Sequence, residues 1–271
     1  MEYLGEVREY WNKNSDGWYK KNDTDEIINR IIRDPASAFN ERAYRLIRKH
    51  FPDMRGKKIL VPSSGNNRPV FAFAALGASV TSSDISERQL ENAAVIAQKH
   101  NWDIDFVRDD TMLMERIKSE NYDFVYTSKG THLWINNLES MYRAIQRVLK
   151  DGGVYIMCDI HPFMRLFAYN NSSVKITKPY TDVSPHFHWR IQDLVNSMVG
   201  MGLDLRELME IHEDNPSFWT ENIKGFDKIG EKELAGLCDW RINPLAAMPN
   251  WLVMCLVKSQ TFEVGPDFIR I

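Results

Sequence analysis

The spacing of hydrophobic residues differs between the first fifty residues and the rest of the chain. The first fifty residues predict helices, and apolar side chains recur at helical spacing most clearly in the third. From residue 58 onward, short apolar runs typical of strands buried on both faces alternate with helical stretches. We expect N-terminal helices at Glu2–Lys13, Asp25–Asp34 and Ser37–His50. We expect strands at Lys58–Pro62, Ser79–Ser83, Ile104–Val107, Tyr122–Thr127, Val154–Asp159, Leu203–His212 and Trp251–Lys258. The connecting helices are expected at Pro69–Leu76, Ser86–His100, Leu138–Leu149, which ends at the Asp151–Gly153 turn, and Trp189–Met201.

This alternation predicts a doubly wound α/β fold behind an N-terminal helical cap. Strands that alternate with helices form a mostly parallel sheet, and right-handed crossovers place helices on both of its faces. Ligands of such sheets bind beyond the carboxyl ends of the strands, near the topological switch point. The loops at those ends are therefore the candidate site: Ser63–Asn67, Asp84–Ser86, Asp109–Met112, Ser128–His132 and Ile160–Phe163.

Composition narrows the class of protein. With 271 residues, 44% hydrophobic and 26% charged, the chain suits one large domain, 1–271. The net charge of −3 gives no reason to expect a nucleic-acid or membrane partner. The polar start MEYLGEVREYW does not resemble a signal peptide. Three widely spaced cysteines, Cys158, Cys238 and Cys255, suggest reduced core thiols rather than a disulfide or zinc site. We therefore expect a cytoplasmic location.

The first candidate loop has the composition of a ligand-binding turn. Ser63, Gly65, Asn66 and Asn67 have small or short polar side chains, so the backbone can approach a ligand closely. Asp84 ends the next strand, nineteen residues after Gly65. A carboxylate at about that distance is placed to accept hydrogen bonds from ribose hydroxyls. The alternative is that Asp84 only caps the following helix.

At these residues the sequence resembles a known family. KILVPSSGNNRPVFAFAALGASVTSSDIS resembles the first cofactor motif of class I S-adenosylmethionine (SAM)-dependent methyltransferases. FVRDD resembles their third strand, and YDFVYTSKGTHLWINNLESMYRAIQRVLKDGGVYIMCDIHPF their fourth strand, helix and fifth strand. HWRIQDLVNSMVGMGLDLRELMEI resembles the later helix and sixth strand, and WLVMCLVK the antiparallel seventh strand. The resemblance runs from about residue 54 to 258. It implies a seven-stranded sheet, SAM as cofactor, a cofactor-binding half at 54–160 and a substrate-side half at 161–271.

One departure concerns the first motif. The family usually has an acidic residue and three glycines, where this sequence has Val61, Ser63, Gly65 and Asn67. Serine and asparagine are still small, and asparagine tolerates positive φ. The loop is therefore expected to keep its shape with one glycine. In the family, the acidic residue that is missing here helps to hold the loop or the amino group of the cofactor.

The resemblance implies a set of cofactor contacts. The first loop would pass under the methionine part of SAM, and the polar residues that follow the fourth strand would lie near the methionine and sulfonium. The end of the second strand would face the ribose and adenine, and the end of the third the adenine amino group, for which Asp109 rivals Asp110. The implied residues are Ser63, Gly65, Asn66, Asn67, Asp84, Ile85, Asp109, Asp110, Thr111, Ser128 and Lys129, with Tyr19 from an N-terminal helix that closes over the cofactor.

Methyl transfer is an in-line displacement that depends mainly on positioning in a dry pocket. A protein base is needed only when the nucleophile is protonated. His132 and His161 are the candidates for a base or substrate ligand, and the alternative for each is a structural hydrogen bond. Two aromatic-rich insertions, at about 162–187 and 213–250, suggest lids over a small-molecule pocket. No metal site is expected, because no cluster completes His186 and His188.

Two other functions compete with the small-molecule methyltransferase. A nicotinamide-dependent oxidoreductase predicts G-x-G-x-x-G after the first strand, which the sequence lacks, and often a Tyr-x-x-x-Lys pair, which occurs nowhere in it. A non-catalytic SAM-binding relative is the second alternative, because the first motif is altered. The sequence does not distinguish which atom of an acceptor is methylated.

Overall fold

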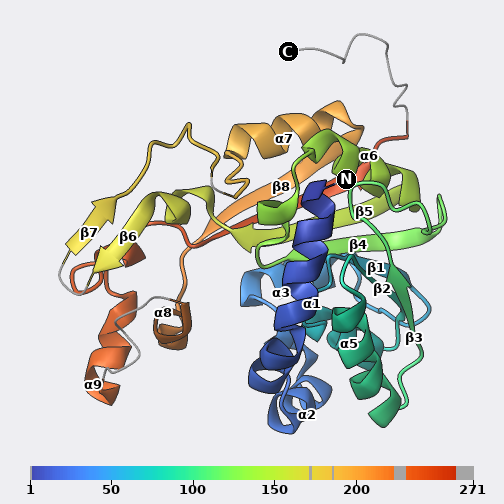
Figure 1. The fold of residues 1–271 in the computed structure, drawn as a ribbon, viewed down its shortest axis with the longest axis horizontal. Helices are drawn as coiled ribbons and strands as arrows, with labels where there is room; N and C mark the ends of the chain where they lie inside the picture. The colour runs from blue at the N-terminus through green and yellow to red at the C-terminus, as the bar shows by residue number, and fades with distance from the viewer. Residues whose placement is uncertain (1, 171–172, 185, 223–229, 261–271) are drawn as a thin grey trace.

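A seven-stranded sheet forms the centre of the molecule (Figure 1). The computed structural model describes residues 2–170, 173–184, 186–222 and 230–260. The strands of the sheet are β1 (Lys58–Pro62), β2 (Ser79–Asp84), β3 (Ile104–Arg108), β4 (Tyr122–Ser128), β5 (Leu149–Ile160), β8 (Leu203–Ile211) and β9 (Trp251–Lys258). They lie in the order β3-β2-β1-β4-β5-β9-β8, and β9 is antiparallel to both neighbours. The switch point therefore falls between β1 and β4.

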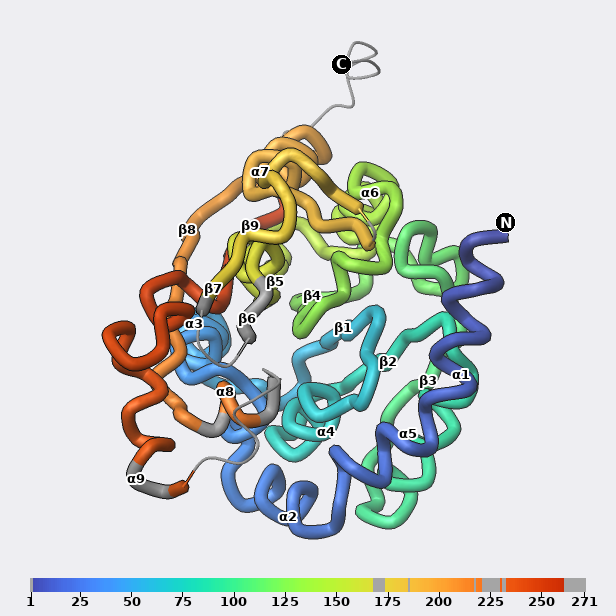
Figure 2. Tube along the Cα trace, turned by 60° about the vertical axis from the view of Figure 1, so that its left-hand side comes forward, coloured from blue at the N-terminus to red at the C-terminus, as the bar shows by residue number. Residues whose placement is uncertain are grey.

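Helices cover both faces of this sheet. They are α1 (Glu2–Asn22), α2 (Asp25–Arg33), α3 (Glu41–His50), α4 (Arg68–Ala75), α5 (Glu87–Lys99), α6 (Leu138–Val148), α7 (Ile191–Gly200), α8 (Pro216–Asn222) and α9 (Glu231–Leu234). Helices α6 and α7 pack on one face, and α3 and α4 on the other. Helix α5 lies beside α4, and α1 packs along α5. Figure 2 shows the strands enclosed by this ring of helices.

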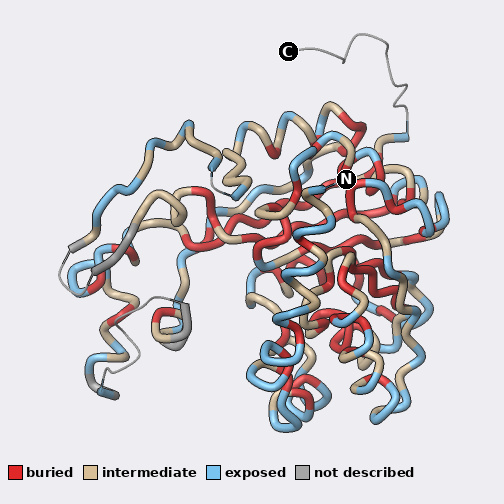
Figure 3. The backbone as a smooth tube through the Cα atoms, viewed as in Figure 1, coloured by how far each residue is buried: buried red, intermediate tan, exposed pale blue. Residues whose placement is uncertain are grey.

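Strand side chains alternate between the two helical layers. In β1, Leu60 faces the α6 layer, whereas Ile59 and Val61 face the α4 layer. The central strands β4, β5 and β9 follow the same alternation. Burial on both faces explains why these strands are continuous apolar runs in the sequence. Figure 3 shows the buried residues concentrated in the sheet and the inner sides of the helices.

The predicted fold class is confirmed, and three element boundaries were wrong. Helix α1 continues past Lys13 to Asn22, because its second half packs along α5. The helix expected at Ser37–His50 is split into a 3-10 turn, η1 (Pro35–Ala38), and α3, because the Asn40 side chain caps α3. The Asp151–Gly153 turn lies inside β5, where the pairing with β4 shifts register.

The two insertions carry structure that the sequence did not predict. The first contains η3 (Pro162–Leu166) and a hairpin of β6 (Phe167–Asn170) and β7 (Ser173–Ile176). The second contains α8, α9, η4 (Ala235–Cys238) and η5 (Pro244–Ala247). In Figure 1 both insertions project to the left, away from α5 and β3. Phe226, one of the aromatic residues in the sequence of the second insertion, lies outside the described residues.

Phe124 provides a test of the core. It is fully buried on β4, with ring centroids 4.9 Å from Phe51 and 5.5 Å from Phe73. We expect Phe124→Ala to lower the free energy of unfolding by about 3–5 kcal/mol, because it leaves a cavity between two layers. Val95→Ala is the control: Val95 is 68% exposed on α5, and its loss should change stability by less than about 0.5 kcal/mol. Urea unfolding measures both, and equal losses would contradict this description of the core.

Candidate active site

The loop after β1 turns through three residues with left-handed backbone. Ser63, Gly65 and Asn67 have φ angles of +48°, +54° and +61°. Glycine adopts this conformation freely, asparagine tolerates it, and serine does so at a cost. A Cβ atom placed on Gly65 would meet no other atom within 4 Å, so the space in front of the loop is open. The adjacent Asn66 is half-buried.

The Asn67 side chain holds the loop from behind. Asn67 is fully buried, and its Nδ2 donates to the Gly65 carbonyl at 2.7 Å and to the Tyr19 hydroxyl at 3.0 Å. Its Oδ1 accepts from the Ser82 hydroxyl on β2 at 2.5 Å. The Tyr19 hydroxyl also lies 3.2 Å from the Gly65 carbonyl. Asparagine at this position therefore does what glycine could not, because its amide links the loop to β2 and to α1.

Asp84 joins the loop to the end of β2. Its Oδ2 accepts from the Gly65 N–H at 3.1 Å, and its Oδ1 from the Ser86 N–H at 2.9 Å. Burial raises the pKa of Asp84, and the N–H groups of Ser86, Gly65 and Ile85 partly oppose that rise. The side-chain cap of α5 comes from Ser86, whose hydroxyl accepts from the Gln89 N–H at 3.2 Å. Ile85 is half-buried beside the carboxylate.

The end of β3 adjoins the same loop. The Thr111 and Ser63 hydroxyls lie 2.8 Å apart. Asp109 uses both carboxylate oxygens within its own turn, on the N–H groups of Asp110 and Arg116. Asp110 is half-buried and uses only Oδ1, on the Met112 N–H at 2.9 Å. Burial, and then the neighbouring charges of Asp109 and Glu115, raise the pKa of Asp110.

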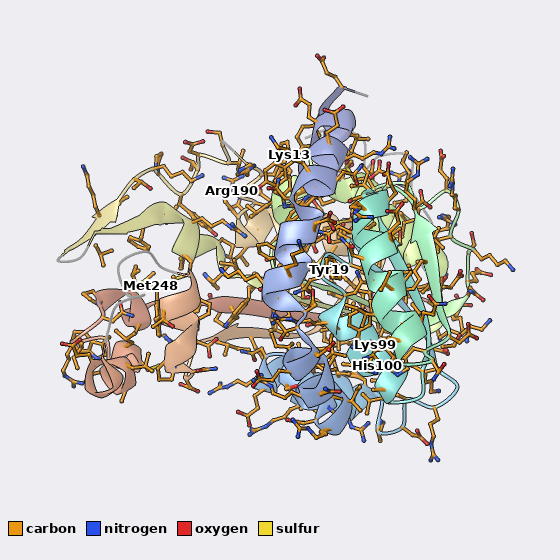
Figure 4. All side chains as sticks on the ribbon, turned by 60° about the horizontal axis from the view of Figure 1, so that its bottom comes forward. Lys13, Tyr19, Lys99, His100, Arg190 and Met248 are labelled. Carbon is orange, nitrogen blue, oxygen red and sulfur yellow. The ribbon has the colours of Figure 1, made fainter. Side chains whose placement is uncertain are left out.

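Helix α1 is fixed against α5, and this places Tyr19 at the loop. The Ser86 hydroxyl donates to Asn12 Oδ1 at 2.6 Å, Arg8 forms an ion pair with Glu87, and Asn92 donates to Ser15 Oγ at 2.9 Å. Figure 4 labels Tyr19 on α1, where this helix lies beside α5. Side chains from both halves of α1 thus make the contacts that position it.

Asp23, which follows α1, is a candidate that sequence reasoning missed. Its Oδ1 accepts from Arg68 Nε at 3.2 Å, directly after the loop, whereas its buried Oδ2 has no hydrogen-bond partner among the described residues. Burial raises the pKa of Asp23 to about 7, although the charges of Arg68 and Lys129 act to lower it. Nothing in the local sequence distinguishes this aspartate, because its position depends on the docking of α1.

The Asp159 carboxylate, at the end of β5, organises the turn after β4. Its Oδ1 accepts from the N–H groups of Gly130 at 2.6 Å and Ile160 at 2.7 Å. Its Oδ2 accepts from the His132 N–H at 3.3 Å and lies 2.9 Å from His132 Nδ1. Burial favours a raised pKa for Asp159, but the hydrogen bond and charge of His132, with the charge of Arg165, lower it to about 2.

The turn itself contains the two predicted residues after β4. Lys129 has left-handed backbone with φ of +54°, its side chain is exposed, and its N–H donates to the Cys158 carbonyl at 3.1 Å. Ser128 is half-buried at the end of β4. His132 is buried, and its Nε2 lies 2.9 Å from the Tyr142 hydroxyl. Both ring nitrogens of His132 are therefore engaged within the protein.

His161 holds the start of the first insertion. Its Nδ1 accepts from the Phe163 N–H at 3.2 Å, which leaves Nε2 to donate to Glu210 at 2.8 Å. The ring is fully buried, and burial lowers its pKa even though Glu210 acts to raise it. His161 is thus placed as a loop-positioning residue, the alternative recognised in the sequence.

Aromatic side chains of α1 cover the turn after β4. The rings of Tyr10 and Trp11 each lie with their centroids 5.3 Å from that of Trp134, in η2 (Thr131–Trp134). The ring centroid of His186, from the first insertion, lies 5.1 Å from that of Trp134. Side chains of the N-terminal helix and of the first insertion therefore meet at Trp134, which follows the turn after β4.

The chain is similar to several known proteins. Residues 60–157 match the model of a methyltransferase domain. An uncharacterized methyltransferase, YbaJ, of Bacillus subtilis is 29% identical over 137 residues, 49% of this chain and 53% of the relative. A SAM-dependent methyltransferase of Mesorhizobium loti has TM-score 0.59 and 18% identity, and covers 79% of this chain and 96% of its own.

A third similarity spans more of the sequence. Phosphoethanolamine N-methyltransferase 2 of Haemonchus contortus, in complex with phosphomonomethylethanolamine and S-adenosylhomocysteine, has TM-score 0.58 and 16% identity, covering 91% of this chain and 60% of that one. At these identities the structures support the fold alone. The chain spans 53% and 33% of the curated relatives it matches. No helix in the described part of the chain is long and apolar enough to cross a membrane. Residues 60–157 therefore match a methyltransferase domain, and the chain shares the fold of SAM-dependent methyltransferases.

Proposed function

We propose that the protein transfers a methyl group from SAM to a small-molecule acceptor. The observation that carries this proposal is the conformation of the loop Ser63–Asn67, which has three residues with left-handed backbone and open space in front of Gly65. Hydrogen bonds from Asn67 to the Gly65 carbonyl and from the Gly65 N–H to Asp84 hold this conformation. A close backbone approach and an adjacent buried carboxylate are what a nucleoside-containing ligand requires. The cytoplasmic location expected from the sequence stays a prediction.

The residues at the strand ends fit the parts of SAM. Asp84, with Ile85 beside it, would accept hydrogen bonds from the ribose hydroxyls, and these would replace part of its hydrogen bonding to the N–H groups of the loop. Asp110 suits the adenine amino group better than Asp109, because Asp109 has both oxygens engaged in its own turn. Thr111 would fix this strand end through Ser63.

Asp23 supplies what the first motif lacks. Its unpartnered Oδ2 lies beside Arg68, and the charge of Lys129 acts on the carboxylate. A buried carboxylate oxygen without a donor is costly, and an ammonium group would satisfy it. We therefore assign Asp23 to the amino group of the methionine part, in place of the acidic residue replaced by Val61. Tyr19 and Asn67 would hold the loop rather than touch the methionine directly.

Positioning and water exclusion account for the chemistry. SAM, when bound, supplies a methyl group on a sulfonium. Ser128 and Lys129 line the turn beside the switch point, and the Tyr10–Trp11–Trp134 rings shield it from water. His132 has both ring nitrogens engaged, which supports a positioning role through Asp159 over a role as general base. His161 would position the first insertion.

Two measurements separate the competing functions. Calorimetry with SAM and with NAD(P)H distinguishes a methyltransferase from an oxidoreductase, and we expect binding of SAM only. Turnover against a library of metabolites distinguishes an enzyme from a non-catalytic SAM-binding relative. A protein that binds neither SAM nor S-adenosylhomocysteine at submillimolar concentration does not have the proposed function.

Asp84→Ala tests the placement of the ribose. We expect SAM affinity to fall by about 1–3 kcal/mol, because a charged hydrogen-bond acceptor is lost. Asp105→Ala is the control, since Asp105 is exposed on the neighbouring strand β3. Calorimetry measures both variants, and an unchanged affinity in Asp84→Ala would show that the cofactor is misplaced.

Gly65→Ala tests whether the open space in front of the loop is the cofactor site. Gly65 and Gly152 both have left-handed φ, +54° and +70°, and a Cβ would meet no atom within 4 Å at either. Alanine should therefore cost each variant a similar 1–2 kcal/mol or so of stability. Only Gly65→Ala should lose affinity for S-adenosylhomocysteine, by about tenfold or more. Equal affinities in the two variants would contradict the site, and calorimetry with urea unfolding provides both readouts.

Asp23→Asn tests the replacement carboxylate. Because the folded pKa of about 7 lies above the unfolded value of 3.8, the stability associated with Asp23 is complete below pH 3.8 and is lost as pH rises towards 7. We expect wild-type stability, relative to Asp23→Asn, to fall by up to about 1.4 kcal/mol per pH unit across this window. The variant should be more stable at pH 8 yet bind SAM about tenfold more weakly. Urea unfolding at several pH values measures the stability difference, and calorimetry measures SAM affinity. Parallel pH profiles of stability in the two proteins would contradict the raised pKa of Asp23, and equal SAM affinities would refute its assignment to the amino group.

A further inference from the structure

Arg165 is a half-buried arginine whose guanidinium makes no hydrogen bond to any described residue. It lies in η3, directly after β5, and its side chain is 13% exposed. Its nearest carboxylate is Asp159, with Nη2 3.9 Å from Oδ1, beyond hydrogen-bond distance. An arginine has five N–H donors, and burying them without acceptors is costly. The side chain is therefore suited to a group that the protein itself does not supply.

Asp159 does not fill this role, because its acceptor capacity is already used. Four donors occupy its two oxygens: the N–H groups of Gly130, Ile160 and His132, and the His132 ring. A carboxylate has about four lone-pair sites. Asp159 thus neutralises part of the charge of Arg165 from 3.9 Å but leaves its donors directed elsewhere.

Arg165 lines a cavity. This cavity has a volume of about 20 Å³, and Arg165, Asp159 and His132 share its wall with the apolar side chains of Met157, Phe187 and Trp189. A volume of this size holds at least one water-sized group. Phe187 and Trp189 stack with centroids 5.8 Å apart. The cavity adjoins the turn after β4, which is the acceptor side of the switch point.

Other basic groups add to the positive field of Arg165. Lys178 Nζ contacts His188 Nδ1, so a neutral His188 accepts from a charged Lys178. Burial, and then the charges of Arg165, Lys178 and His186, lower the pKa of His188 to about 4, against the opposing charge of Asp182. The Asp182 carboxylate accepts from the N–H and hydroxyl of Ser184.

We propose that the methyl acceptor carries an anionic group, a carboxylate or a phosphate, which Arg165 binds in this cavity with support from Lys178. The planar guanidinium presents two parallel N–H groups that match either anion. The rest of the acceptor would extend out of the cavity past its apolar rim, with its nucleophile towards the turn after β4. This inference rests on the proposed methyltransferase function and names the substrate class.

The test titrates the full-length protein, saturated with S-adenosylhomocysteine, with inorganic phosphate or acetate at constant ionic strength. We expect saturable stabilisation against heat by one anion, with half-saturation at roughly 1–10 mM for a ligand of so few atoms. Arg165→Gln should raise that concentration at least about tenfold, and Arg165→Lys by less, because lysine keeps the charge without the fork. Arg206→Gln is the control: Arg206 is exposed on β8, paired with Asp204, and its loss should leave binding unchanged.

The stronger anion identifies the acceptor group as phosphate or carboxylate. Wild-type affinity in Arg165→Gln, or no saturation by either anion, overturns the proposal. Should Arg165→Gln fail to unfold cooperatively, Arg165→Lys decides, and wild-type affinity there overturns it equally. Parallel calorimetry with S-adenosylhomocysteine keeps the two hypotheses apart. Cofactor binding without anion binding refutes the anion subsite, whereas Arg165-dependent anion binding without cofactor binding refutes the methyltransferase function.

Discussion

The site depends on holding a left-handed turn open at the end of β1. Three of its residues have positive φ, and only one of them is a glycine. Asn67 contributes in two ways, because it adopts positive φ itself and because its side-chain amide bonds to Gly65, Tyr19 and Ser82. Ser63 adopts the same region at a cost, offset by its contact with Thr111. Because Asp84 accepts from the Gly65 N–H, the loop, β2 and β3 form one hydrogen-bonded unit. Cofactor affinity should therefore follow the integrity of this unit rather than the number of glycines.

The N-terminal helix completes the site from outside the sheet. Its second half, with Asn14 and Gly17, is weakly helical by itself, yet it continues because Ser15 and Asp16 bond to α5. That docking brings Tyr19 behind the loop and leaves Asp23 next to Arg68. A carboxylate absent from β1 can thus be replaced from a different element, since binding requires a position in space and not in the sequence.

The features of the fold and site that could be predicted from the sequence are those that depend on residues close together in the chain. Strands β1, β4, β5 and β9 were predictable because burial on both faces makes them largely apolar runs, and Asp84 because it ends the next strand nineteen residues after Gly65. The full length of α1, the place of Asp23 beside Arg68 and the β6–β7 hairpin were not, because each depends on residues far away in the chain. Likewise, His132 is recognisable as a polar residue after β4, but its two partners, Asp159 and Tyr142, are brought to it only by the fold.

Asp159 links the two halves of the proposed reaction. Its oxygens are occupied by N–H groups of the turn after β4 and by His132, so within the described part of the chain Arg165 makes no hydrogen bond to Asp159. Had Asp159 bonded to Arg165 instead, the turn would lose its anchor and the cavity its attraction for an anion. In the proposed site, Asp159 thus holds the turn after β4 in shape and leaves the positive charge of Arg165 available to the acceptor. The low pKa of Asp159 keeps this arrangement ionised throughout the neutral range.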